Sequence, residues 1–537
     1  MHTFDVKQPK TLADAMIREP NYNQLSIEEF KTPFERGLDK NNRWVILSSL
    51  LPWAQMTETY SRTLNAKMGR PAKPARVVIG AIIIKHKLCL PDEEVILTIQ
   101  ENLYLQYFLG FNGFSHKKPF DASLFVTIRR RLSKQVFDDM TDSFLAAVAK
   151  VEKKRSARTK RTVREKEPPQ PPSSEFVEKT STEASQDSDK RSGMLLIDAT
   201  VAPSDIKYPT DLDLLNSSRE QSEKLIDELW ECVKAPGTVK PRSYRRVARK
   251  AYLTMAKKRN KKSNELRKAV RKQLNYLNRN IKTINMLLDK FKDRKIPFSH
   301  SQYRTWLIIQ ELYRQQQQMF NQRSHQIADR IVSVSQPHVR PIVRGKAGRK
   351  VEFGAKISAS VVDGYAFLDR LSWDSYHEAA DLPTQVELYK ERFGFYPEVV
   401  ITDGIYGTKV NRAWLAEKQI RFSGKPLGRP PKMTLENEEQ LKAERKRRRK
   451  ENGIRSRIEG KFGEGKRGYN LDLVKAKHPE TAESWIAAIF FVMNLARWLR
   501  DYFFVLFWKW VKLCLFRLFS YVKEHFIIYT SPAWGCE

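Results

Sequence analysis

The stretch MLLID at residues 194–198 is decisive for the fold predicted from this sequence. It is a short apolar run ending in an acid, which is typical of a buried strand. Strands are also predicted at 351–361 and 365–373, joined by a hairpin turn at Asp363-Gly364, and at 397–403 and 420–423. Helices are predicted at 381–393, 409–418, 433–452 and 454–500. This order favours an α/β protein with a mixed sheet flanked by helices.

A long basic segment, about 219–335, follows the first strand and is predicted to be a helical insertion. Apolar residues recur at three- and four-residue steps from Leu266 to Phe291 and again from Trp306 to Phe320. Two such helices would fold back as an antiparallel, coiled-coil-like hairpin that buries both stripes. Its outer face carries cations that could follow a nucleic-acid backbone: Arg267, Lys268, Arg271, Lys272, Arg279 and Lys282.

The region before residue 150 is predicted to be helical. Arg129 and Arg130 lie in a helix that begins near Ser123. A basic helix end can enter a DNA groove, but it can equally be the solvated face of a helical bundle, and the pattern leaves both open. Residues 151–192 are rich in charge, Pro and Ser, which predicts a disordered linker.

The sequence therefore divides into six parts. These are a helical DNA-binding domain (1–150), the linker (151–192), the first part of a catalytic domain (193–218), the helical insertion (219–340), the second catalytic part (341–500) and an amphipathic aromatic tail (501–537).

Charge and cysteine content narrow the class of protein. In 537 residues, 97 Lys and Arg stand against 62 Asp and Glu, for a net charge of +35. This excess indicates a polyanionic partner, with nucleic acid favoured over an acidic membrane surface. The four cysteines are far apart and form no CxxC pair, which argues against a disulfide scaffold or zinc ribbon and for a reducing cytosol. The first ten residues lack the apolar core of a signal peptide.

Three acids stand out in this basic chain. Asp198 and Asp403 each end a predicted strand, and Glu459 lies on a later helix among cations. Carboxylates are ligands that Mg²⁺ prefers, and two such ions can act on a phosphodiester. In the alternative interpretation, the aspartates cap turns and Glu459 pairs with a neighbouring Arg.

Several blocks of sequence resemble the bacterial insertion-sequence DDE transposases. NGIRSRIEGKFGEGK (452–466) is similar to their Tyr-Arg-Glu-Lys (YREK-type) signature, which Arg455, Glu459 and Lys466 match at three and six intervening residues. Residues 198–215 and 402–430 resemble the regions of the two catalytic aspartates, and 69–132 resembles the helical N-terminal domain of the same group. The signature Tyr is replaced by Asn452, which puts the details of strand-end processing in doubt.

The resemblance implies a ribonuclease H-like core that binds terminal inverted repeats, cleaves them by metal-dependent hydrolysis and joins the 3′ ends to target DNA. It implies that Asp198, Asp403 and Glu459 bind two Mg²⁺ ions, with Mn²⁺ as a substitute, and that Arg455 and Lys466 hold the DNA backbone. The partners would be double-stranded DNA and a second copy of the chain, as a homodimer or higher assembly, in the cytoplasm beside the bacterial chromosome. The alternative is a catalytically inactive DNA-binding protein derived from such an enzyme.

Two further signals leave alternatives open. Arg70 and Arg429 each lie in a Gly-Arg-Pro motif that is either a minor-groove reader or a plain basic loop. Residues 502–528 form an aromatic stretch in which cations interrupt the apolar run, so stable membrane insertion is not expected. We expect an amphipathic helix that packs on the core or on another subunit, with binding to an anionic membrane surface as the other option.

Overall fold

A mixed sheet lies at the centre of the protein. The computed structural model describes residues 37–64, 72–164, 191–291, 295–343, 351–429, 434 and 437–527. Its strands are β1 (Met194–Pro203), β2 (Arg340–Val343), β3 (Val351–Val362), β4 (Tyr365–Ser372), β5 (Val399–Ile401) and β6 (Arg421–Phe422). The order is β2-β3-β1-β5-β6, and β4 also pairs with β3. β3 is antiparallel to β1, β2 and β4, whereas β5 is parallel to β1 and β6. The predicted mixed α/β architecture is confirmed.

The hairpin between β3 and β4 turns at the predicted dipeptide. Asp363 and Gly364 both have positive φ, 48° and 77°. Two consecutive left-handed residues match the right-handed twist of the flanking strands, and Asp-Gly is a favoured pair for this turn. A Cβ atom at Gly364 would also meet the guanidinium of Arg497, which would have to move aside.

Alternate residues of β1 face two different apolar clusters. Leu195 and Ile197 pack with α13 (Leu382–Phe393) and α14 (Lys409–Glu417). Leu196 faces the other side, where α15 (Glu438–Gly468) and α16 (Pro479–Ile527) contribute to the cluster. Side chains alternate between the two faces of a strand, so both faces of β1 are covered by helices. By the same alternation Asp198 lies on the side of Leu196.

The N-terminal helices share their core with the sheet. They are α2 (Arg43–Leu50), α3 (Trp53–Ser61), α4 (Ala75–Leu88), α5 (Asp92–Glu101), α6 (Leu103–Phe108), α7 (Leu124–Arg131) and α8 (Lys134–Arg164). Side chains from these helices belong to the same apolar cluster as β1, β3 and α16. The N-terminal helices are therefore fixed on the sheet domain.

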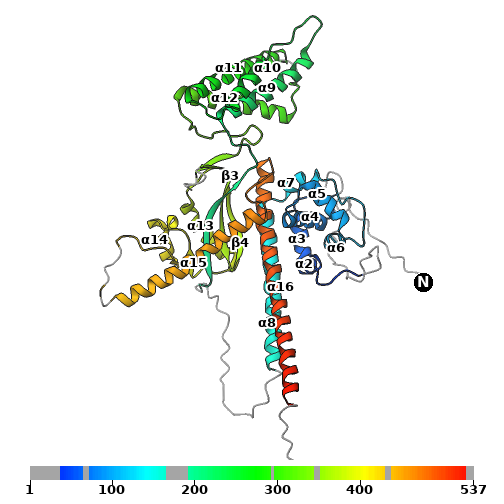
Figure 1. The fold of residues 1–537 in the computed structure, drawn as a ribbon, viewed down its shortest axis with the longest axis vertical. Helices are drawn as coiled ribbons and strands as arrows, with labels where there is room; N and C mark the ends of the chain where they lie inside the picture. Colours follow the sequence, from blue (N-terminus) through cyan, green and yellow to red (C-terminus); the bar gives the residue numbers. More distant parts are fainter. Residues whose placement is uncertain are drawn as a thin grey trace, which may run out of the picture.

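α8 and α16 run side by side and in the same direction (Figure 1). Phe137 packs near Phe491 and Phe144 near Trp498, at ring-centroid distances of 5.9 and 6.1 Å. α8 continues to Arg164, so the linker predicted from residue 151 begins as helix; residues 165–190 lie outside the described part of the chain. The reason is composition, because Lys, Arg, Ala and Glu favour a helix and no Gly or Pro occurs before Pro168.

The insertion between β1 and β2 is a helical bundle with its own apolar core. It contains α9 (Asp211–Val233), α10 (Arg245–Ala256), α11 (Ser263–Leu288) and α12 (His300–Gln322). Figure 1 shows the bundle set apart from the sheet, beyond one end of it. α11 packs most extensively along α9, which the predicted two-helix hairpin did not include. α9 also carries a buried stripe, including Leu215, Ile226 and Leu229, so three long helices share the core.

Two further predictions about helices need correction. The stretches 433–452 and 454–500 were predicted as separate helices, but α15 continues through Gly453 and the break comes after Gly468. α16 then extends without interruption into the predicted tail. Within the described residues, no helix is both long and apolar enough to cross a membrane.

Candidate active site

The register of the sheet aligns Asp198 and Asp403. In the parallel pairing of β1 with β5, Leu196 lies opposite Ile401. Each aspartate follows two residues later, so the two lie level with each other, just past the point where the β1–β5 pairing stops. β1 itself continues to Pro203, with Asp198 opposite Ala359 of β3, so Asp198 does not end its strand as predicted. It lies instead where the pairing with β5 stops.

The surroundings of Asp198 disfavour its negative charge. Burial and the nearby carboxylates of Glu378 and Asp403 raise the pKa of Asp198 from 3.8 to about 6, against the opposing influence of Arg455 and of the bond from the Ala199 N–H. That backbone amide donates to Asp198 Oδ1 at 2.8 Å. Asp403 is exposed, and its carboxylate accepts a hydrogen bond from the Gly404 N–H at 2.6 Å. The aspartate pair, Asp198 and Asp403, is therefore a concentration of negative charge in a basic protein.

α15 brings the signature residues to this end of the sheet. It packs against β1 and β5, and its buried Glu451 pairs with Arg421 of β6 at 2.6 Å. At about 100° per residue, Arg455, Glu459 and Lys466 lie within about 40° of one another on α15. Their common face therefore flanks the buried stripe that contains Ile458 and Phe462.

Glu459 is paired with its own helix neighbour. Its Oε1 lies 3.1 Å from an Arg455 guanidinium nitrogen, one turn away, and its side chain is 54% exposed. Among the described residues, no three His, Cys, Asp or Glu side chains are gathered closely enough to hold a metal ion. The structure thus brings together Asp198, Asp403 and Arg455, but it does not assemble Glu459 with the aspartates as a ready-made triad.

The donor atoms nevertheless fit a hard divalent cation. Every acid around Asp198 offers carboxylate oxygen, the ligand type that Mg²⁺ prefers over nitrogen or sulfur. A cation would also favour the charged form of Asp198, which the neighbouring carboxylates now disfavour. The aspartate pair can therefore serve as the main part of a magnesium site.

Glu378 is a residue of this site that the sequence analysis missed. It lies in a short 3₁₀ helix, Glu378–Asp381, and its charge acts on both Asp198 and Tyr406. Glu378 Oε1 forms an ion pair with Lys356 Nζ, which lies 2.9 Å away. Lys356 Nζ also donates a hydrogen bond to the Tyr376 carbonyl. Glu378 lies in the stretch WDSYHEAADL (373–382). Nothing in the local sequence pattern distinguishes it from a surface acid.

The structure contradicts the prediction that Arg129 contacts DNA. Arg129 is buried, and its two terminal nitrogens donate to the two oxygens of Asp92 at 2.9 and 2.8 Å. Lys85 Nζ lies 2.8 Å from the same carboxylate. Buried charges are tolerated when they are paired, so Arg129 serves to hold α7 against α5.

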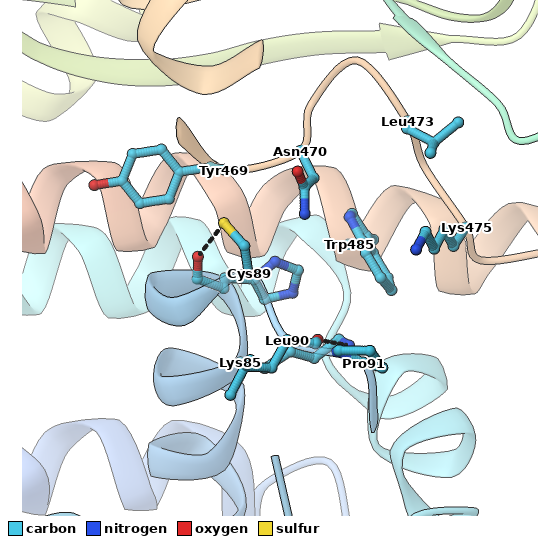
Figure 2. A pocket seen from close by; sticks show the side chains of 10 residues that line it. Lys85, Cys89, Leu90, Pro91, Tyr469, Asn470, Leu473, Lys475 and Trp485 are labelled. Atoms are coloured by element: carbon cyan, nitrogen blue, oxygen red, sulfur yellow. Dashed lines mark hydrogen bonds between the residues drawn. The ribbon is translucent and has the colours of Figure 1, made fainter. Parts of the chain in front are cut away.

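This charged cluster lies at the seam between the N-terminal helices and α16. Lys85 Nζ and the Arg129 guanidinium lie 4.6 and 5.6 Å from the ring centre of Trp485. His86 packs edge-on against the same ring at 5.1 Å. Figure 2 shows Lys85 and Cys89 facing Tyr469, Asn470 and Trp485 across a small pocket. The seam is a packed structural contact.

The other predicted DNA-binding residues occupy more accessible positions. Arg130 is exposed at the end of α7, and Arg429 is exposed in the segment after β6. Lys466 is partly buried in the last turn of α15. Arg70 lies outside the described residues.

Two family models match the chain in the regions just described. The model "Transposase DDE domain" matches residues 400–496, which include Asp403, β6 and α15, and "Transposase domain (DUF772)" matches residues 32–131. These matches support a DDE-type transposase of insertion sequences.

A curated relative of this chain is "Uncharacterized protein ORF8 in nfe locus" of Rhizobium meliloti. The two are 28% identical over 222 residues, which cover 41% of the chain and 87% of the relative. No solved structure matches the chain. The matched regions contain the second aspartate and the signature helix, whereas β1 with Asp198 and the inserted bundle lie outside both family models.

Proposed function

We propose that this transposase binds the terminal inverted repeats of its element, cleaves them by metal-dependent phosphodiester hydrolysis and joins the 3′ ends to target DNA. The observation that carries the proposal is the register that aligns Asp198 with Asp403, beneath a helix that presents Arg455, Glu459 and Lys466 on one face. The antiparallel β4-β3-β1 strands, followed by the parallel β5 and β6, also support a ribonuclease H-like core. Asp198, Asp403 and Glu459 are assigned as the catalytic acids.

Two Mg²⁺ ions, or Mn²⁺ in their place, would be held by these three carboxylates. When bound, such ions activate the attacking oxygen and stabilise the leaving oxygen of a phosphodiester. The pair between Glu459 and Arg455 is a partly exposed i,i+4 contact, which contributes only about 0.3–0.5 kcal/mol. Glu459 can therefore leave its ion pair with Arg455 and bind a metal ion at a small cost in free energy.

The cations of α15 have a complementary role. Arg455 acts electrostatically on Asp198, so a phosphate that approaches the aspartates also approaches this guanidinium. Preorganised positive charge stabilises the charge that develops on a transferring phosphate. Arg455 and Lys466 are thus assigned to the DNA backbone near the cut, with the exposed Arg130 and Arg429 as further contacts. Because two element ends must be joined, we propose a homodimer or higher assembly on DNA.

The test compares Asp198→Asn and Glu459→Gln with the wild type on duplexes carrying the element's own ends. Each change keeps the shape of the side chain and removes one carboxylate charge. We expect strand cleavage in Mg²⁺ to fall at least 10³-fold, while binding of the same duplex stays within a fewfold. Glu444→Gln is the matched control, since Glu444 lies on the same helix, outside the signature, and pairs only with Arg448 among the described residues.

The two outcomes separate the proposal from its alternative. Full cleavage by Asp198→Asn would remove the assignment of the catalytic acids. A wild-type protein that binds the ends but never nicks them in Mg²⁺ or Mn²⁺ would identify the alternative, a catalytically inactive DNA-binding descendant of a transposase.

A further inference from the structure

The most cationic part of the inserted bundle is α10 with its flanking loops. Residues 240–262 contain eleven Lys and Arg residues and no Asp or Glu. α10 contributes no side chain to the apolar core of the bundle. It is attached by polar contacts, in which Arg245 bonds Asp227 of α9 and the Gln273 side chain of α11 donates to the Ala248 carbonyl. Core packing therefore does not explain the sequence of α10.

Four residues form an outward stripe on this helix. The buried side chains of α10 are Ala248 and Met255. At about 100° per residue, Arg246, Lys250, Leu253 and Lys257 lie on the opposite side, within about 60° of one another. All four are exposed. We call Arg246, Lys250 and Lys257 the α10 cations.

The acids of the bundle do not neutralise the α10 cations. Asp227 of α9 is taken by Lys240 and Arg245, and Asp213 by Lys207 and Tyr252. Within the described part of the chain, none of the α10 cations forms an ion pair. Three like charges are thus held in a row on one rigid helix without compensation.

Two cations of the neighbouring helix α11 are engaged inside the bundle. Arg267 stacks on Phe320 at 4.0 Å and Arg279 on Tyr244 at 4.3 Å, measured from the guanidinium carbon to the ring centre. These contacts hold the two arginines against the bundle. The other cations predicted on the outer face of α11 are exposed, so the positive surface of the bundle includes α11 as well as α10: Lys268, Arg271, Lys272 and Lys282.

Further cations connect the bundle with the rest of the protein. Burial, together with the charges of Arg130 on α7 and Arg304 on α12, lowers the pKa of His478, the residue before α16. Groups that influence one histidine lie near it, so positive charge from the N-terminal helices and from the bundle meets at this junction.

We infer that the α10 cations bind the phosphate backbone of duplex DNA, as a second, sequence-independent contact outside the proposed active site. The inference rests on the proposed function only in that DNA is the substrate. Its chemical basis is release of counterions from phosphates, which makes affinity fall with salt in proportion to the number of contacts. Contacts to phosphate position a duplex without reading its bases.

The test measures binding of the full-length protein to a 40-base-pair duplex of arbitrary sequence over a range of KCl concentrations. In Arg246→Ala/Lys250→Ala/Lys257→Ala we expect at least tenfold weaker binding near 0.1 M salt. We also expect the slope of log K against log salt to become shallower by about 3, roughly one for each lost phosphate contact. Arg246→Lys/Lys250→Arg/Lys257→Arg keeps the charges and should bind as the wild type does.

The matched control removes the same charge from ion-paired cations. Lys207, Lys234 and Arg314 pair with Asp213, Glu231 and Glu311, and their triple alanine variant should bind nearly as the wild type does. Wild-type affinity and slope in the α10 variant, or an equal loss in the control, would overturn the inference. Because the duplex carries no element ends and is not cleaved, this result is independent of catalysis. Conversely, if the protein cleaves its element's ends but the α10 variant binds duplex as the wild type does, this inference is wrong and the proposed function stands.

Discussion

Two partly buried aspartates of this protein have opposite electrostatic surroundings. Asp92, at the start of α5, is held by Arg129 and Lys85. Burial alone would raise its pKa, but the hydrogen bonds and charges of these cations outweigh burial and lower the pKa. At Asp198, in β1, burial raises the pKa first, the nearby carboxylates of Glu378 and Asp403 add to it, and the pKa rises to about 6.

The difference separates a structural charge from a functional one. At Asp92 each charge is compensated by the fold itself, so the cluster stabilises the seam between the N-terminal helices and α16. At Asp198 the fold gathers carboxylates that Arg455 and Lys356 compensate only in part, since the pKa of Asp198 stays raised. An arrangement that reduces stability in this way is typical of a site that binds a ligand of opposite charge.

The largest expected effect on stability is at Asp92. Asp92→Asn would leave the buried cations Lys85 and Arg129 without their acid, and breaking a buried pair in this way costs about 3–5 kcal/mol. Urea denaturation measures the loss, with Glu101→Gln at the exposed end of the same helix as the control. Asp198→Asn should show no such loss near neutral pH. A comparable loss in both aspartate variants would contradict the distinction between them.

The elements around the aspartates were largely predictable from sequence, because their signals are local. The Asp-Gly turn and the apolar runs before Asp198 and Asp403 each need only a few neighbouring residues. The continuity of α15 through Gly453 was not predictable, since it depends on packing from outside the helix. On either side of this glycine, which weakens the helix locally, Glu451 is buried and pairs with Arg421, and Ile458 is buried in the core.

The errors at the site have the same origin. Arg129 resembles any solvated arginine at a helix end, and only its partner Asp92, 37 residues away, gives it a buried role. Glu378 joins the surroundings of Asp198 from a segment 180 residues further along the chain. Such contacts connect distant segments, and no local pattern of residue types reveals them.

A second prediction concerns pH and has opposite signs at the two aspartates. Because the folded-state pKa of Asp198 is above its ordinary value of 3.8, the native protein binds the extra proton, and stability falls as pH rises from about 4 to 6. Two pKa units correspond to about 3 kcal/mol. Asp92, with a lowered pKa, contributes stability above pH 4 that is lost as pH falls below it.

The measurement is unfolding free energy against pH, in EDTA, for the wild type and both Asn variants. Asp198→Asn should gain stability relative to the wild type between pH 4.5 and 7.5. The deficit of Asp92→Asn should persist above pH 5 and shrink below pH 4. Parallel curves for the wild type and Asp198→Asn would show that Asp198 carries no raised pKa.

The smallest expected effect is the response to a divalent cation. If the aspartate pair binds Mg²⁺ in the folded state, the cation at ten times its Kd stabilises that state by about 1.4 kcal/mol, which raises Tm by about 1–2 °C in a protein of this size. The wild type and Asp92→Asn should both show this rise when MgCl₂ replaces KCl at equal ionic strength. Asp198→Asn should not, because its amide has lost the charge that attracts the ion. An equal rise in Asp198→Asn would place Mg²⁺ elsewhere on the protein. It would also mean that the negative charge gathered at this end of the sheet serves a purpose other than holding a metal.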